Sequence, residues 1–122
     1  MLYCWQHKPE RDGLMSEFTF SEMLAMQAAL QEKYKDRWEP IGPNTGKNKL
    51  LWMIGEVGEV IDIIKQNGEQ KALQKPELRH ALVEEMADVL MYYGDVMLCY
   101  GITAEELKSA YIQKFERNMT RW

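Results

Sequence analysis

Apolar side chains recur along most of the chain with the spacing of an α-helix, and four segments carry this pattern. These segments run from Thr19 to about Arg37, from about Lys47 to Gln66, from about Pro76 to Tyr100 and from about Ala104 to Met119. Thr19–Glu22 and Thr103–Glu106 are capping-box patterns, and Gly101 suits the residue that follows a helix. No segment alternates with period two between turns, so we expect no strands. The pattern predicts an all-α bundle of four main helices.

The connections between the predicted helices carry helix-breaking residues. Residues 1–18 contain a proline and an Asp-Gly pair and are expected to be irregular. Residues 38–46 hold two prolines and two glycines, which predicts one long loop that could face a substrate. The Asn-Gly pair at 67–68 is a strong helix stop, and the piece that follows it has room for a short helical turn.

The composition narrows the class of protein. With 122 residues and 46% apolar content, residues 1–122 are expected to form a single globular domain. The net charge of −4 argues against a nucleic-acid polymer as partner, because no basic stripe exists. Cys4 and Cys99 lack metal-site spacing and fit a reduced, intracellular chain. Since neither a signal peptide nor an apolar run of membrane-spanning length is apparent, we expect a cytoplasmic protein that does not contact membranes.

Acids interrupt the apolar stripes of the two central helices. The stripe of the second helix consists of Trp52, Glu56, Glu59 and Ile63. The stripe of the third helix consists of Ala81, Glu85, Asp88, Tyr92, Asp95 and Cys99. Burying isolated carboxylates costs several kcal/mol apiece, so such a cluster requires a cation or a shared proton. Four carboxylates suit a hard divalent ion such as Mg²⁺ or Mn²⁺.

The heights of these acids along the helices can be compared by counting. Glu59 lies eight residues before Asn67, and Glu85 lies eight residues after Glu77, so each is about 12 Å from its end of the connection. If the two helices are antiparallel neighbours, the two acidic pairs meet at the same height. The sequence therefore predicts that Glu56, Glu59, Glu85 and Asp88 converge on one metal.

The same counting places further polar residues. A tight antiparallel return of the last helix sets Lys114 and Asn118 near the acids, where a lysine suits a polyphosphate ligand. Asp95 falls at the level of three residues of the second helix, which offer hydrogen-bonding groups and an aromatic face suited to a nucleoside: Asn48, Lys49 and Trp52.

Three motifs resemble the MazG-like nucleotide pyrophosphohydrolases of the all-α NTP pyrophosphatase superfamily: G-E-V-G-E at 55–59, E-E-M-A-D-V-L at 84–90 and K-F-E-R-N at 114–118. The similarity covers roughly residues 20–121. The chain departs from the pattern at Gly55, where many members carry a glutamate, and at Asn118, which is often arginine.

The resemblance implies hydrolysis of a (deoxy)nucleoside triphosphate to the monophosphate and pyrophosphate, in nucleotide-pool house-cleaning. It implies Mg²⁺ held by the positions matching the four acids, and a homodimer or homotetramer. It also implies that Asp95, Asn48, Lys114 and Asn118 face the nucleotide, which favours a pyrimidine or non-standard deoxynucleotide. We assign catalytic roles to Glu56, which orients the attacking water, and to Lys114. The predicted substrate-binding residues are Asn48, Lys49, Trp52, Asp95, Lys114, Asn118 and Arg121.

Other interpretations remain open. Taken alone, one acidic pair most simply belongs to a solvated helix face. In the same way, Lys114 alone is most simply a surface lysine, and Trp52 alone is most simply a core residue. A non-catalytic helical interaction module would pair its acids with Lys or Arg. Glu77 and His80 form an E-x-x-H unit of the kind found in ferritin-like di-metal carboxylate proteins, which need two such units. Finally, the central helices are apolar on more than one face, which predicts a homo-oligomer.

Overall fold

The computed structural model describes residues 17–121, in which all regular structure is helical. The helices are α2 (Phe20–Lys33), α3 (Gly46–Asn67), α4 (Glu69–Gln74), α5 (Pro76–Tyr100) and α6 (Ala104–Arg121). The all-α prediction is confirmed for these residues, and α4 is the short turn expected after the Asn-Gly pair. The irregular segment predicted for residues 1–18 lies, apart from its last two residues, outside the described part of the chain.

Local hydrogen bonds explain where the helices begin. The Glu22 backbone N–H donates to Thr19 Oγ1 at 3.1 Å, and the Thr19 backbone N–H donates to Glu22 Oε1 at 2.8 Å. The same reciprocal pair joins Thr103 and Glu106 at 3.0 and 3.2 Å, so both predicted capping boxes are confirmed. Gly101 closes α5 in the left-handed conformation with φ of 65°, which glycine adopts without steric cost.

The helix α2 ends four residues earlier than the pattern predicts. Its cap is Tyr34, and the backbone N–H groups of Arg37 and Trp38 both donate to the Tyr34 carbonyl, at 2.9 and 2.8 Å. The Trp38 ring stacks on the Tyr34 ring with centroids 4.7 Å apart. This folded turn leads the chain directly into the loop before α3 and brings Trp38 back toward the helices.

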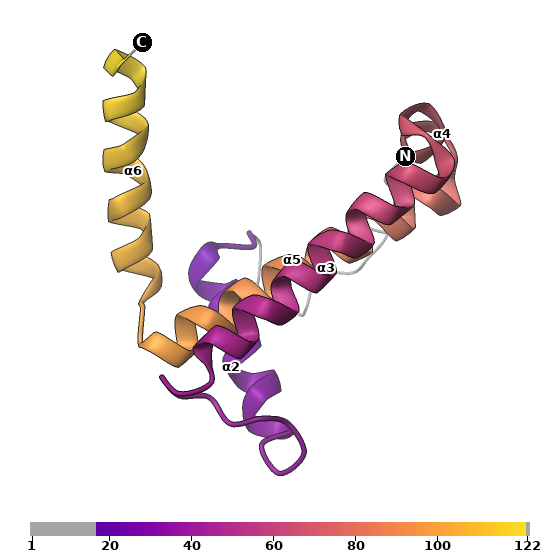
Figure 1. Ribbon diagram of the computed structural model, residues 1–122. Helices are drawn as coiled ribbons and strands as arrows, with labels where there is room; N and C mark the ends of the chain where they lie inside the picture. The colour runs from indigo at the N-terminus through magenta and orange to yellow at the C-terminus, as the bar shows by residue number, and fades with distance from the viewer. Residues whose placement is uncertain (1–16, 122) are drawn as a thin grey trace.

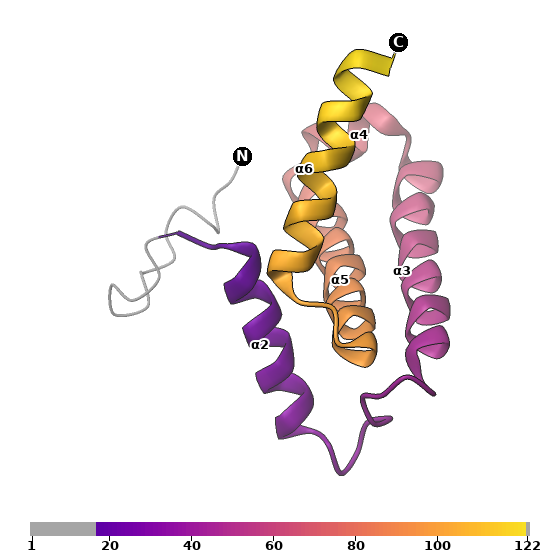
Figure 2. The same cartoon turned by 90° about the vertical axis from the view of Figure 1, so that its left-hand side faces the viewer.

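The long helices α3 and α5 lie side by side in opposite directions, joined at one end through α4 (Figures 1 and 2). The helix α2 packs against α5. The start of α3 meets the end of α5 so closely that a Cβ on Gly46 would collide with the Tyr100 ring. This antiparallel pair brings the two acidic stripes face to face, as the counting of heights predicts.

The placement predicted for α6 is wrong in the single chain. After Gly101 this helix does not return along α5; it contacts α2 alone and extends away from the α3–α5 pair (Figure 1). Lys114 and Asn118 are exposed there, away from the acids. The count of heights assumed a tight return, whereas the two residues that connect α5 to α6 turn α6 outward (Figure 1). A closed bundle of four helices thus remains a prediction for the assembled protein.

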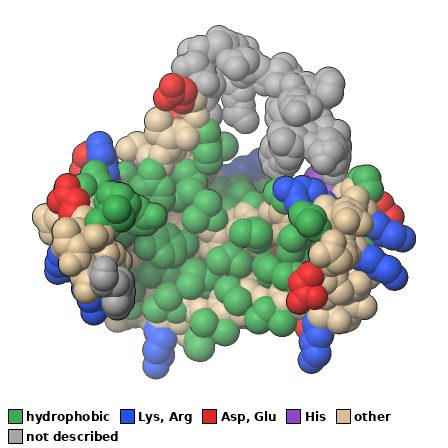
Figure 3. Space-filling model, turned by 90° about the horizontal axis from the view of Figure 1, so that it is seen from above, with side chains coloured by type: hydrophobic (Ala, Val, Ile, Leu, Met, Phe, Trp, Pro, Cys, Tyr) green, Lys and Arg blue, Asp and Glu red, His purple; other side chains and the backbone are tan. Residues whose placement is uncertain are grey.

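Much apolar surface stays uncovered. Figure 3 shows a broad band of hydrophobic side chains across one face of the molecule. Large hydrophobic side chains with more than half of their surface exposed occur on α3 at Leu51, Trp52, Ile54 and Ile61, on α5 at Met86, and on α6 at Tyr111, Phe115 and Met119. Among the described helices, none is long and apolar enough to cross a membrane.

Candidate metal and nucleotide site

Three of the predicted acids converge between α3 and α5. Glu56, Glu85 and Asp88 each place a carboxylate oxygen within 4.8 Å of the others, and all three side chains are half-buried. Each comes from a helix face turned toward the neighbouring helix, one from α3 and two from α5. Within residues 17–121, none of the three forms an ion pair with a basic side chain. The group therefore carries uncompensated negative charge, which a bound cation would offset.

The electrostatics of this group are visible at Glu56. Partial burial raises the pKa of its carboxyl group above the usual 4.5, and hydrogen bonding to Glu85 and the charges of Asp88, Glu85 and Glu59 raise it further. Burial also raises the pKa of the Tyr92 phenol, with additional contributions from the charges of Glu56, Asp95 and Asp88. Tyr92 therefore stays protonated near neutral pH and can donate a hydrogen bond beside the acids.

Glu59 lies at the edge of this arrangement. It is exposed and is not one of the three carboxylates that converge, although its charge reaches Glu56. One helical turn separates the two residues, so Glu59 shares the α3 face but sits further toward the α4 end. A carboxylate in this position can approach a cation held by the other three through a change of rotamer.

A cavity of about 400 Å³ opens next to the acids. Asp88 belongs both to the acidic group and to the wall of this cavity. The remaining walls come from α2, the loop after it, α3 and α5, and consist of Gln27, Leu30, Gln31, Trp38, Glu39, Lys49, Trp52, Met91, Tyr92 and Asp95. Two indole rings and several hydrogen-bonding groups beside a carboxylate cluster are the components of a site for an aromatic ligand that carries phosphates.

Asp95 is the most deeply buried polar residue of this wall, with 3% of its surface exposed. Its Oδ1 atom accepts two hydrogen bonds from α2, at 2.8 Å from Gln27 Nε2 and at 3.0 Å from Gln31 Nε2. Both glutamines are themselves buried. The two donors fix the Asp95 carboxylate against α2 and join that helix to α5 by polar contacts as well as packing.

The other predicted ligand residues divide into two groups. Lys49 and Trp52 line the cavity together with Asp95. Asn48 lies beside it and donates from Nδ2 to Glu39 Oε2 at 2.9 Å. Lys114, Asn118 and Arg121 are all exposed on α6 and lie outside this cavity in the single chain.

Three residues of the cavity were missed from the sequence. Gln27 and Gln31 stand four apart on α2, a spacing that places both on one helix face, but this spacing gave no reason to expect Asp95 as their acceptor. Trp38 follows α2 in the loop that was expected to face a substrate, and its ring now forms one wall. The sequence does contain one signal for the two glutamines: they stand among apolar residues of α2, which implies that their side chains are buried.

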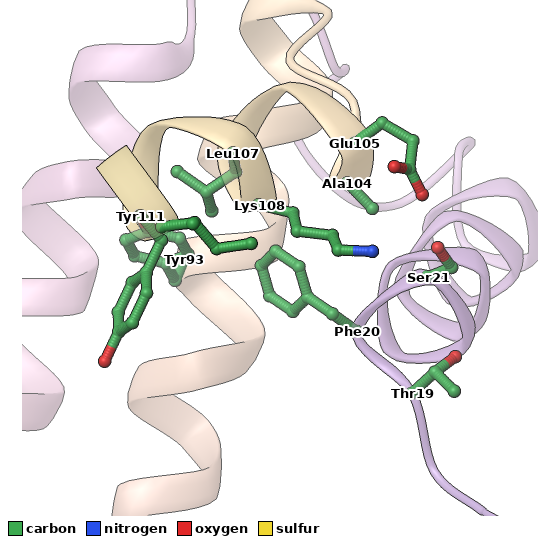
Figure 4. Close-up of a pocket in the computed structure, with 10 residues that line it drawn as sticks. Thr19, Phe20, Ser21, Tyr93, Ala104, Glu105, Leu107, Lys108 and Tyr111 are labelled. Carbon is green, nitrogen blue, oxygen red and sulfur yellow. The ribbon is translucent and has the colours of Figure 1, made fainter. Parts of the chain in front are cut away.

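A larger cavity lies elsewhere. It has a volume of about 640 Å³ and opens where α6 leaves the body, with the Phe20 ring and the Lys108 stem inside it (Figure 4). Its wall is mostly apolar and includes none of the acidic group. We regard it as the open junction between α6 and the α2–α5 body rather than as a site of chemistry.

The E-x-x-H unit does not take part in the acidic group. His80 Nε2 lies 3.3 Å from Glu84 Oε2, one turn along the same helix, and neither residue joins the three converging carboxylates. The described residues thus provide an all-oxygen set of ligands, which differs from the mixed Glu and His set of di-iron bundles.

The comparisons with known proteins agree with this chemistry. Residues 44–120 match the model of the MazG nucleotide pyrophosphohydrolase domain. That range contains the acidic group, Lys49, Asp95 and nearly all of α6, whereas α2 lies outside it. The search of curated proteins found no match, and neither did the search of solved structures.

Proposed function

We propose that this chain, which belongs to the MazG nucleotide pyrophosphohydrolase family, hydrolyses a nucleoside triphosphate to the nucleoside monophosphate and pyrophosphate with the help of Mg²⁺. The observation that carries the proposal is the convergence of Glu56, Glu85 and Asp88 at the mouth of a cavity with aromatic walls. The acids are placed to hold a cation against the phosphates, while the cavity accommodates the nucleoside.

The residues present fit a hard divalent ion. All three converging groups are carboxylates. Burial, the hydrogen bond to Glu85 and the neighbouring negative charges raise the pKa of Glu56, and a bound cation would offset these charges. We assign Glu59 to the same ion as a fourth ligand. At this position Mg²⁺, or Mn²⁺ in its place, polarises the phosphate oxygens and neutralises their charge.

The chain's own residues account for the proton and the geometry of the reaction. Glu56 orients a water molecule toward the α-phosphorus and accepts its proton as the new P–O bond forms. The bond between the α-phosphorus and the bridging oxygen breaks, and pyrophosphate leaves with that oxygen. Trp52, Asn48 and Lys49 hold the nucleoside while this occurs.

The position of α6 supports a homo-oligomer as the active form. Its apolar face, with Phe115 and Met119, is exposed, and so are Leu51 and Ile54 on α3. An isolated helix of 18 residues that contacts only the end of α2 gains little from packing. We propose that a second copy covers these faces, as a homodimer or within a homotetramer, and that assembly brings Lys114, Asn118 and Arg121 to the phosphates.

The test is a panel of the eight common NTPs and dNTPs, assayed for pyrophosphate with and without Mg²⁺. Pyrophosphate should appear only with the metal. In ¹⁸O-labelled water the label should enter the nucleoside monophosphate, because the α-phosphorus is attacked. Label in pyrophosphate would move the attack to the β-phosphorus, and label in orthophosphate would indicate a different reaction. Absence of turnover with every triphosphate would favour a non-catalytic interaction module.

A further inference from the structure

An apolar groove between α2 and α5 has no part in the proposed chemistry. It has a volume of about 530 Å³ and includes none of the acidic group. Three large side chains in it are 43–47% exposed, so the groove leaves apolar surface uncovered in the single chain, which favours an occupant. The apolar walls of this α2–α5 groove consist of Met23, Met26 and Leu30 on α2 and of Ala87, Leu90 and Met91 on α5.

The described part of the chain begins at this groove. Phe18 is the second residue that the structure describes, and its side chain belongs to the groove wall. That side chain is 61% exposed, so it covers the apolar surface only in part. Residues 1–16, which lie outside the described residues, therefore join the described chain at the rim of the groove.

The sequence of residues 1–16 contains a short apolar run. Residues 1–5 read M-L-Y-C-W, five apolar residues in succession, and residues 6–13 are mostly polar. Tyr3 and Trp5 stand two apart, so their rings fall on the same side of an extended chain. Methionine side chains adapt to irregular partners and make favourable contacts with aromatic rings, and three methionines line the groove. The chemistry of the run thus matches that of the groove.

The connection is long enough for the run to reach the groove. Trp5 precedes Phe18 by 13 residues, which span up to about 40 Å when extended. The part of α2 that lines the groove, Met23–Lys33, is only about 15 Å long. Pro9 and the Asp-Gly pair at 12–13 favour turns, which would allow the chain to reverse. A tether of this length gives the run a local concentration in the millimolar range, well above that of a second copy at micromolar protein.

We propose that residues 1–5 dock into the α2–α5 groove of their own chain, with the rings of Tyr3 and Trp5 against the methionines. The run and α2 both precede residues 44–120, which match the family model. They therefore form a unit that this chain adds to the matched domain. This inference goes beyond the proposed function and does not depend on it.

Docking at this groove would also support the cavity beside the acids. The groove and that cavity share three residues of their walls: Gln27, Leu30 and Met91. Two of the three are on α2, which packs against α5 but not against α3. A run of apolar residues that fills the groove would hold α2 against α5 and so keep one wall of the cavity in place.

Crosslinking of the full chain tests the docking directly, because Cys4 stands between the two aromatic residues. Ala29→Cys places a thiol in the groove wall. Ala28→Cys is the matched control, since this neighbouring alanine is also exposed but lies outside that wall. A short bismaleimide should join Cys4 to position 29 about 10-fold faster than to position 28, and Cys99 is buried and should stay unreacted.

Denaturing gels and peptide mass spectrometry then show which chains are joined. The product should link two positions of one chain and migrate as a monomer. Equal rates at positions 28 and 29, or a product that joins two chains, overturn the proposal.

The fluorescence of Trp5 gives a second readout. Subtracting the spectrum of Trp5→Phe from that of the wild type isolates the Trp5 emission, which should have the short wavelength of a buried indole. Leu90→Asp places a charge in the groove and should shift this emission to longer wavelength. Leu73→Asp is the control, because Leu73 is also exposed but lies on α4, outside the groove, and should leave the emission unchanged.

The remaining outcomes decide between this occupant and others. Emission typical of an exposed indole in the wild type overturns the proposal. If Leu90→Asp splits an oligomer and leaves the Trp5 emission unchanged, a second copy covers the groove and the proposal is equally wrong. Should Leu90→Asp fail to fold, Tyr3→Ser removes one ring from the run and must lower the crosslinking rate at position 29 relative to position 28; an unchanged ratio overturns the proposal. None of these measurements requires turnover of a nucleotide, so the proposed function is tested separately.

Discussion

At the scale of single residues, the acidic group makes the stability of the folded protein depend on pH. The folded protein raises the pKa of Glu56 above its usual 4.5, so the charged form is disfavoured in the fold. The contribution of this group to stability is therefore full below pH 4.5 and is lost as the pH rises through the higher, folded value.

Glu56→Gln tests this in the metal-free protein. The difference in melting temperature between the variant and the wild type should be small at pH 4 and should grow in favour of the variant as the pH rises to 7. Addition of Mg²⁺ at pH 7 should stabilise the wild type more than the variant. A constant difference between pH 4 and pH 7 would contradict the electrostatic account of the group.

Catalytic activity should depend on both Glu56 and Glu59. Glu56→Gln and Glu59→Gln should each lower kcat by about 10²-fold or more, since one removes the proposed base and both remove a ligand. The two variants differ in the metal-free protein, where Glu56→Gln should give the larger gain in stability because Glu56 is the half-buried member. Full activity in Glu59→Gln removes that residue from the site.

Lys114 tests whether α6 of a second copy of the chain contributes to the site. Lys114→Ala should depress the rate by about 10²-fold, the usual loss when one electrostatic contact to a leaving group is removed. Lys108→Ala is the matched control, because this lysine is also exposed on α6 but lies at the junction with α2. Equal rates for the two variants would remove Lys114 from the site.

At the scale of elements, the contact between the start of α3 and the end of α5 sets the register of the acids. Gly46→Ala pushes the tip of the Tyr100 ring toward solvent, and because this side chain is 47% exposed the change should lower the free energy of unfolding, measured by urea denaturation, by no more than about 1 kcal/mol. Gly42→Ala is the control, since a Cβ there meets nothing within 4 Å and the change should be near neutral. A neutral Gly46→Ala would mean that the ring moves without cost.

The helices themselves could be predicted largely from local signals. Two capping boxes, Gly101 and the Asn-Gly pair fixed the ends of the elements. Counting residues along α3 and α5 predicted that four acids meet, and three of them do, whereas Glu59 lies outside the group. The direction of α6 could not be predicted in the same way, because two extended residues at its start decide it and no pattern encodes their angle. The role of Gln27 and Gln31 was missed because their acceptor lies 68 and 64 residues away in the chain.

At the scale of the whole molecule, assembly is the main expectation. Light scattering at micromolar concentration should give at least a dimer, because the described chain exposes apolar faces on α3, α5 and α6. Ile54→Glu places a charge in the middle of the α3 face and should yield smaller species and a large loss of turnover. A folded, monodisperse monomer of the wild type would contradict this prediction.

The contact between α2 and Asp95 has a consequence for how such a protein changes over time. The acids that converge lie on α3 and α5, whereas the two amides that bind Asp95 lie on α2, outside residues 44–120. Loss of either amide withdraws a donor from a buried carboxylate, which is costly unless position 95 changes as well. Among relatives, substitutions at positions 27, 31 and 95 should therefore occur together rather than singly.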